Sequence, residues 1–162
     1  MVSDKVPKPV TTFQAKRRNL PHWQLPGSIY FITWRLKRDE ILSPEERTII
    51  LKSLLHWDNV KWTVYATVIM PNHVHLIAQP STAPDGGSIN LSEIIRSVKT
   101  FSARTINNMR GTQGTFWQDE RYDRIIRDEA ELLEKWQYLR NNPVARGLAP
   151  SPETYPWLYE KS

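Results

Sequence analysis

The stretch from residue 61 to residue 79 constrains the fold more than any other part of this chain. Apolar residues alternate with others on both sides of Pro71-Asn72, a pair typical of tight turns. The pattern predicts two antiparallel strands joined at that turn. On the first strand we expect one shared face for Trp62, Val64, Ala66 and Val68. On the second, alternation separates His73, His75 and Ile77 from Val74, Leu76 and Ala78.

Two of the four histidines in the chain therefore lie side by side on one strand face. A pair of imidazoles held on a strand can chelate a divalent metal, and a metal assists attack on phosphates. An isolated His-x-His pair is more often structural. The strand context, the preceding turn and the scarcity of histidine elsewhere favour the metal site here, whereas His22 and His56 stand in no comparable pattern.

The other elements complete a β-α-β-β-α-β order with a third helix appended. Apolar residues expected on the inner face of the second helix are Leu91, Ile94, Ile95, Val98 and Phe101. The expected elements are a strand over 28–36, a helix from Ser43 to His56, the two strands above, a helix opened by Asn90, a strand over 121–127, and a helix from a capping box at Asp128 and Glu131 to Pro143, before an irregular remainder. This order predicts an α+β, ferredoxin-like split βαβ fold, with an antiparallel sheet and helices on one face. The other face is left free for a site beside the C-terminal catalytic helix.

Length and composition indicate one domain over residues 21–162, preceded by a basic and mobile arm over residues 1–20. The absence of cysteine excludes disulfides, thiol catalysis and cysteine-ligated zinc, and suits a cytoplasmic protein. No apolar run approaches membrane-spanning length, and the first 19 residues contain no secretory signal. A net charge of +5 points weakly to a polyanionic partner.

The third helix offers a second group of chemical side chains. Its expected packing stripe consists of Leu132, Leu133, Trp136 and Leu139. Tyr138 falls roughly opposite the middle of that stripe, and Asn142 lies beside Tyr138 one turn later. We expect the phenol and the amide oxygen to share a face that the core does not occupy.

Together, the two imidazoles and one amide oxygen make a three-point site with open positions for water and a phosphate. Such a site suits Mg²⁺ or Mn²⁺, and Zn²⁺ or Ni²⁺ could also occupy it. A tyrosine phenol is a weak nucleophile unless neighbouring positive charge favours the phenolate. Attack by Tyr138 on a phosphodiester would leave a phosphotyrosine link and a free hydroxyl on the other strand end.

These residues resemble a known family, the single-tyrosine HUH transposases of small bacterial insertion sequences, and most closely its REP-associated tyrosine transposase branch. The resemblance covers about residues 21–156. The blocks that carry it are Pro26-Gly27-Ser28-Ile29-Tyr30-Phe31-Ile32-Thr33, Val68-Ile69-Met70-Pro71-Asn72-His73-Val74-His75-Leu76-Ile77, Ser97-Val98-Lys99-Thr100-Phe101-Ser102, Phe116-Trp117-Gln118, Tyr122-Asp123-Arg124-Ile125-Ile126-Arg127-Asp128 and Tyr138-Leu139-Arg140-Asn141-Asn142-Pro143-Val144-Ala145-Arg146-Gly147.

The resemblance implies that His73 and His75 are metal ligands, that Tyr138 is the nucleophile and that Asn142 is the third ligand. The implied substrate is single-stranded DNA near a small hairpin or palindrome. Cleavage would give a 5′-phosphotyrosine intermediate and a free 3′-hydroxyl, and rejoining would reverse it. The insertion-sequence relatives act as dimers, so both a homodimer and a monomer remain open.

Candidate DNA phosphate contacts are Arg96, Lys99 and Arg104 on the second helix and Lys16, Arg17 and Arg18 in the arm, against the alternative of solvated basic faces. Trp117 is expected in the core, and Gln118 is a candidate site-lining residue.

Three other functions compete with the transposase reading. Histidine-triad hydrolases need a third histidine where Ile77 stands, and two-histidine phosphoesterases need a second separated motif. A non-catalytic single-strand DNA-binding protein on the same sheet is the remaining alternative.

Overall fold

The computed structural model describes residues 25–162, so the predicted arm over residues 1–20, with Lys16, Arg17 and Arg18, lies outside the described residues. The described part contains a five-stranded sheet of order β4-β1-β3-β2-β5 in which every neighbouring pair is antiparallel. The elements are β1 (Ile29–Arg35), α1 (Pro44–Leu55), β2 (Trp62–Ile69), β3 (His73–Pro80), α2 (Leu91–Arg110), β4 (Tyr122–Ile126), α3 (Glu129–Ala145), a short 3-10 helix (Pro152–Thr154) and β5 (Leu158–Glu160).

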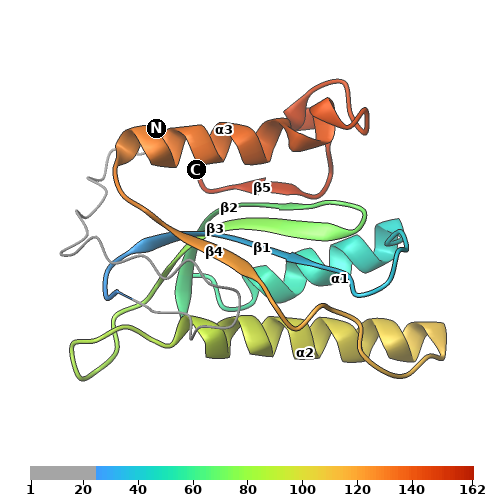
Figure 1. Cartoon of the computed structure of the whole chain (residues 1–162), viewed down its shortest axis with the longest axis horizontal. Helices are drawn as coiled ribbons and strands as arrows, with labels where there is room; N and C mark the ends of the chain where they lie inside the picture. Colours follow the sequence, from blue (N-terminus) through green and yellow to red (C-terminus); the bar gives the residue numbers. More distant parts are fainter. Residues whose placement is uncertain (1–24) are drawn as a thin grey trace.

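Helices cover both faces of this sheet. Figure 1 shows α1 and α2 below the sheet and α3 above it. The β1-α1-β2-β3-α2-β4 order with strand order β4-β1-β3-β2 is the predicted ferredoxin-like arrangement. The appended helix α3 packs on the second face, so that the sheet separates two hydrophobic cores, one between the sheet and α1 and α2, the other between the sheet and α3.

The strand β5 corrects the prediction of an irregular C-terminal remainder. Its three residues pair with β2, with Thr67 opposite Tyr159. A strand this short, preceded by three prolines, carries too little alternation to be recognised from sequence. Glu160 also accepts hydrogen bonds from Trp136 Nε1 (2.9 Å) and Arg140 Nε (2.8 Å), so that β5 fastens α3 to the sheet.

A β-bulge in β2 corrects the prediction that four of its residues share one face. The pairing with β3 shifts register between Val64 and Ala66. Because one extra residue reverses the alternation, Trp62 and Val64 enter the core of α1 and α2, whereas Ala66 and Val68 face α3. On β3 the alternation is regular, and the predicted separation of the histidine face from the Val74 face is confirmed.

The inner face of α2 differs from the prediction at one position. Phe101 is 60% exposed, while Ser102 is buried in its place. The Ser102 hydroxyl donates to the carbonyl of Val98 (2.8 Å) and accepts from Trp117 Nε1 (3.0 Å), so its burial leaves no polar atom unpaired. Trp117 is buried as predicted.

Helix ends follow the predicted caps in part. Ser43 and Glu46 form the full capping box of α1. Asp128 caps α3 by accepting from the Glu131 amide (2.8 Å), but the Glu131 carboxylate accepts from the Arg127 amide instead of completing the box.

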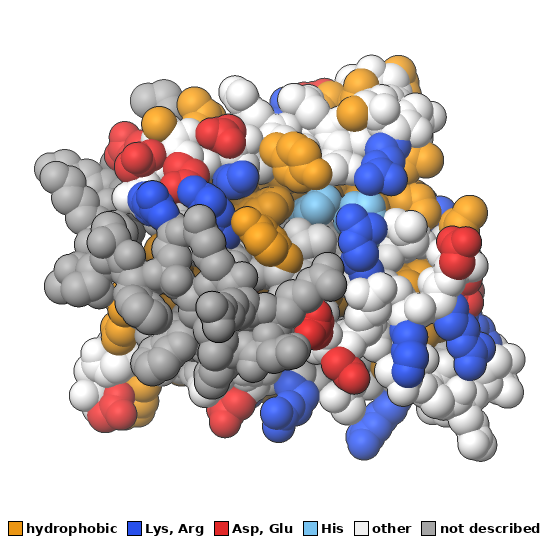
Figure 2. Space-filling model, viewed as in Figure 1, with side chains coloured by type: hydrophobic (Ala, Val, Ile, Leu, Met, Phe, Trp, Pro, Cys, Tyr) orange, Lys and Arg blue, Asp and Glu red, His pale blue; other side chains and the backbone are white. Residues whose placement is uncertain are grey.

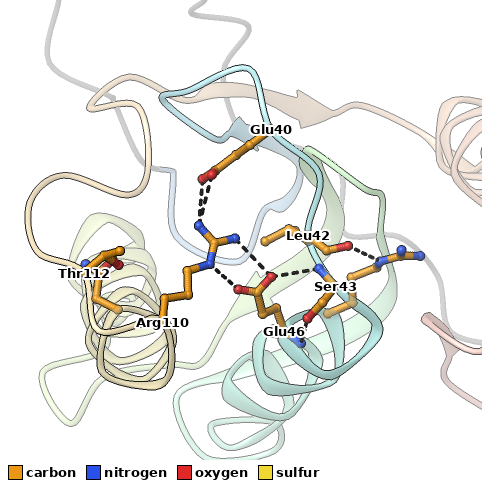
Figure 3. A network of polar contacts seen from close by, with 8 residues as sticks. Glu40, Leu42, Ser43, Glu46, Arg110 and Thr112 are labelled. Carbon is orange, nitrogen blue, oxygen red and sulfur yellow. Dashed lines mark hydrogen bonds and ion pairs between the residues drawn. The ribbon is translucent and has the colours of Figure 1, made fainter.

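A polar network joins the start of α1 to the end of α2. Figure 3 shows Arg110 between the carboxylates of Glu40 and Glu46, and Glu46 also reaches the backbone of Ser43. Burial raises the pKa of Glu46, but its bonds to Arg110 and Ser43 outweigh that effect and hold the pKa below its usual value. None of the helices in residues 25–162 has the length and apolar character to span a bilayer.

Candidate metal and nucleophile site

The two histidines of β3 lie side by side under α3, on the sheet face that the alternation predicts. Their exposed fractions are only 1% for His73 and 4% for His75. The two Nε2 atoms are 3.1 Å apart, and the rings meet edge to face with 4.7 Å between centroids. Imidazole surface is visible in Figure 2 with basic side chains on two sides of it.

Hydrogen bonds at the far side of each ring fix how the imidazoles point. Asn72 Oδ1 lies 2.6 Å from His73 Nδ1, and Thr33 Oγ1 lies 2.7 Å from His75 Nδ1. An amide oxygen only accepts, so His73 carries its proton on Nδ1 and leaves a lone pair on Nε2. The Thr33 hydroxyl can accept from His75 in the same way. Outer partners of this kind orient imidazole ligands in metal sites.

Neither Thr33 nor Asn72 was identified as a functional residue from sequence. Thr33 lies directly opposite His75 on the neighbouring strand β1. Strand alternation places Thr33 on the same face as Phe31, but only the strand order brings β1 next to β3. The Pro71-Asn72 pair predicts a turn, and Asn72 has the second role of orienting His73.

Asn142 completes the group from α3. It is 6% exposed, its Nδ2 lies 3.4 Å from His75 Nε2, and its Oδ1 is buried with no hydrogen-bond partner among the described residues. Rotating the side-chain amide of Asn142 by half a turn exchanges the positions of Nδ2 and Oδ1. An unpaired buried carbonyl oxygen is costly unless a ligand uses it, and the amide that carries this one lies beside His75 Nε2.

The prediction that Tyr138 and Asn142 share a face away from the core is wrong for Asn142. The packing stripe of α3 runs through Leu132, Leu139, Asn142 and Pro143, and Leu133 is 60% exposed. Tyr138 precedes Leu139 and is thus about 100° round the helix, at the edge of the stripe. A single apolar stripe predicts packing on one apolar core, whereas α3 packs on a sheet face that also holds the histidines.

Tyr138 lies at the open side of the histidine pair. It is 53% exposed, and its ring meets His75 edge-on at 5.4 Å between centroids. Phe31 stacks on His75 at 5.6 Å and contacts Tyr138 edge-on at 6.1 Å. An open pocket runs along this side of α3, lined by Glu134, Gln137, Tyr138, Asn141, Asn142 and Ala145. The phenol is therefore accessible and adjacent to the imidazoles.

The electrostatic environment keeps both imidazoles neutral near pH 7. Burial, followed by the charges of Arg35 and Arg146, lowers the pKa of His73 to about 4. Burial, the neighbouring His73 and the same two arginines lower the pKa of His75 to about 3. Neutral imidazoles have lone pairs available for a metal.

The donor set fits a divalent metal with mixed nitrogen and oxygen ligands. The two Nε2 atoms lie 3.1 Å apart with the Asn142 amide next to His75, an arrangement that a cation bound between these groups would stabilise. Residues 25–162 hold no cluster of three His, Cys, Asp or Glu side chains, so the third protein donor would be the Asn142 amide.

The predicted DNA-contacting residues of α2 lie away from this site. The helix packs on the opposite face of the sheet from the histidines. Arg96 and Arg104 are exposed there. Lys99 donates to the Gln118 carbonyl (2.6 Å), and burial, then the charge of Arg121, lowers the Lys99 pKa. The Gln118 side chain donates to the Leu36 carbonyl (3.2 Å), at the end of β1, and does not line the pocket beside Tyr138.

Two proteins of Haemophilus influenzae are similar to this chain. One, an uncharacterized protein, is 32% identical over an alignment of 96 residues that covers 48% of this chain and 52% of the relative. The other, provisionally named a REP-associated tyrosine transposase, is 23% identical over an alignment of 100 residues that covers 57% of this chain and 55% of the relative. The chain spans about half the length of these relatives.

The fold has a counterpart among solved structures. A REP-associated tyrosine transposase bound to a REP hairpin superposes with a TM-score of 0.71 at 19% identity, over 86% of this chain and 81% of that one. A family described as "Transposase IS200 like" matches residues 27–142, a span that contains His73, His75, Tyr138 and Asn142. With most of its length inside that match, the chain belongs to the IS200-like transposase family.

Proposed function

We propose that this protein cleaves and rejoins single-stranded DNA through a covalent link to Tyr138, with a divalent metal held by His73, His75 and Asn142. The main observation behind this proposal is that the Tyr138 ring contacts His75 and that the buried Asn142 oxygen has no hydrogen-bond partner among the described residues. Membership of a transposase family supports DNA as the substrate. The structural counterpart bound to a REP hairpin supports a strand that carries a hairpin.

In the proposed reaction the Tyr138 oxygen attacks a backbone phosphorus. The bond from phosphorus to the tyrosine oxygen forms as the bond from phosphorus to the 3′-oxygen breaks. The phenol loses its proton, and the departing 3′-oxygen gains one. The products are a 5′-phosphotyrosine link and a free 3′-hydroxyl, and attack by a 3′-hydroxyl on that link rejoins the strand.

The residues of the site have separate roles in this scheme. Mg²⁺ or Mn²⁺, when bound, supplies positive charge that polarises the phosphate. Asn72 and Thr33 hold the imidazoles so that both Nε2 atoms face the same point. The α3 helix fixes Tyr138 next to them, because Leu139 and Asn142 of the same helix are buried against the sheet.

The test is formation of an SDS-stable protein–DNA adduct with hairpin-bearing single-stranded DNA and Mn²⁺. Wild type should form the adduct, and Tyr138→Phe should form none. His73→Ala should abolish the adduct while leaving much of the DNA binding. Binding by wild type without any adduct would favour the non-catalytic DNA-binding alternative. Cleavage retained by His73→Ala would refute the metal role.

A further inference from the structure

Two arginines flank the histidine pair, and neither has an acidic partner among residues 25–162. Arg110, Arg121, Arg124 and Arg140 are each paired with a carboxylate. Arg35 and Arg146 take part in no ion pair within the described part of the chain, and both side chains are exposed. Two free guanidinium groups beside two buried imidazoles leave the site electropositive.

Arg35 reaches the site from β1. Its Cα is paired with that of His73 on β3, so the two side chains leave the sheet on the same face as direct cross-strand neighbours. Thr33, two residues earlier on β1, stands in the same relation to His75 and contacts it. The β1 strand therefore places one side chain against each histidine, a hydroxyl at His75 and a guanidinium at His73.

Arg146 stands at the end of α3, one turn after Asn142. Its amide donates to the Asn142 carbonyl (3.1 Å), and the Asn142 side chain is 3.4 Å from His75 Nε2. The two arginines thus stand on different elements, β1 and the end of α3, and each of these elements carries a side chain that contacts His75, Thr33 from β1 and Asn142 from α3. After burial, the charges of both arginines contribute to the lowered pKa of each histidine.

We propose that Arg35 and Arg146 bind the phosphate group that Tyr138 attacks, one from β1 and one from the end of α3. This inference rests on the proposed function. A guanidinium offers planar paired donors that match phosphate oxygens, and its charge is permanent. Like charges gathered around neutral imidazoles are unfavourable until an anion lies between them, and a backbone phosphate supplies that anion. This gives the two side chains a role that the α2 basic residues, on the other sheet face, do not share.

The experiment compares wild type with Arg35→Ala, Arg146→Ala, Arg35→Lys and Arg146→Lys. Lys52→Ala is the matched control, because Lys52 is an exposed cation on α1, behind the sheet. One readout is the single-turnover rate of adduct formation, and the other is the dependence of DNA affinity on salt. Mn²⁺ affinity is measured alongside.

Each alanine variant should slow adduct formation by about tenfold or more. Each should also make the negative slope of log affinity against log salt concentration shallower by about 0.7, the value for one phosphate contact on single-stranded DNA. The lysine variants should keep the slope and recover part of the rate, since they retain charge without the paired donors. Lys52→Ala should match wild type, and Mn²⁺ affinity should not fall in any arginine variant.

Wild-type rates and slopes in both alanine variants would overturn the inference, and so would a fall in Mn²⁺ affinity that accounts for the lost rate. If an alanine variant fails to fold, the lysine variant tests the inference in its place. An unchanged rate of adduct formation in the lysine variant would contradict a role for the paired guanidinium donors. Failure of wild type to form any adduct would instead overturn the proposed cleavage. The salt slopes would then still decide whether the two arginines contact DNA phosphate.

Discussion

Asn142 Nδ2 lies 3.4 Å from His75 Nε2, although the two residues are 67 positions apart in the chain. This contact joins the helix that carries Tyr138 to the strand that carries the histidines. It also explains why α3 holds an asparagine in the middle of an otherwise apolar packing stripe, next to Leu139 and Pro143.

Replacing Asn142 with leucine should separate stability from metal binding. The orphaned Oδ1 is an unsatisfied buried acceptor, so Asn142→Leu should raise the free energy of unfolding of the metal-free protein by about 1 kcal/mol. The same change should weaken Mn²⁺ binding by about tenfold or more, whereas Asn142→Asp should retain it. Urea unfolding and Mn²⁺ titration measure the two effects. Equal Mn²⁺ affinity in wild type and Asn142→Leu would exclude Asn142 as a ligand.

Removing the outer hydrogen bonds of the imidazoles should weaken the metal site without removing a ligand. Asn72→Ala and Thr33→Val each free one Nδ1 atom, and we expect Mn²⁺ affinity to fall about 10- to 100-fold. Thr33→Ser keeps the hydroxyl and serves as the control, with affinity near that of wild type. Calorimetric titration gives the values, and equal affinities for Thr33→Val and Thr33→Ser would contradict a positioning role.

The buried histidines should make the metal-free protein less stable in mild acid. Their folded pKa values, about 4 and about 3, lie below the ordinary value of 6.5. Between pH 6.5 and the folded values the unfolded chain binds more protons, so the free energy of unfolding decreases as the pH falls through this window. From pH 7 to pH 5 the pair should contribute a loss on the order of 2–4 kcal/mol.

Urea unfolding of wild type and of the double variant His73→Gln/His75→Gln, both with chelator, isolates this contribution. Carboxylates such as Glu46 add a loss of the same sign in both proteins, because the pKa of Glu46 is also lowered. The free-energy difference between the two proteins should therefore stay constant above pH 7 and change as the pH falls below it. A double variant with the same pH dependence as wild type would show that the histidines are not the cause.

The site should assemble within one chain. The Tyr138 ring contacts His75 and Phe31 of its own chain, so all the proposed catalytic groups come from a single copy. A mixture of Tyr138→Phe and His73→Ala should then form no adduct beyond either variant alone. Recovery of adduct in the mixture would mean that the tyrosine of one copy works with the histidines of another.

Local patterns predicted most elements but not the contacts between them. Alternation on β3 and the spacing of Tyr138 and Asn142 are local, and each was visible in the sequence. The bulge before Ala66 was not visible, because one extra residue in a strand leaves no distinct sequence pattern. Ser102 faces the core where Phe101 was expected. Its hydroxyl makes two hydrogen bonds there, and a hydrophobicity pattern does not predict such bonds. The roles of Thr33 and Arg35 depend on the strand order, which pairs them with His75 and His73, and that of Arg146 depends on the docking of α3, which brings Asn142 to His75.

The bulge in β2 has a consequence for how this domain can vary. Residues before it, such as Trp62, belong to the core of α1 and α2, and residues after it, such as Val68, belong to the core beneath α3. Substitutions on its two sides should have nearly additive effects on stability, since the two sides lie in different buried clusters, although Trp157 packs against both. The strand β2 can therefore acquire substitutions on the face beneath α3 while its packing against α1 and α2 stays unchanged.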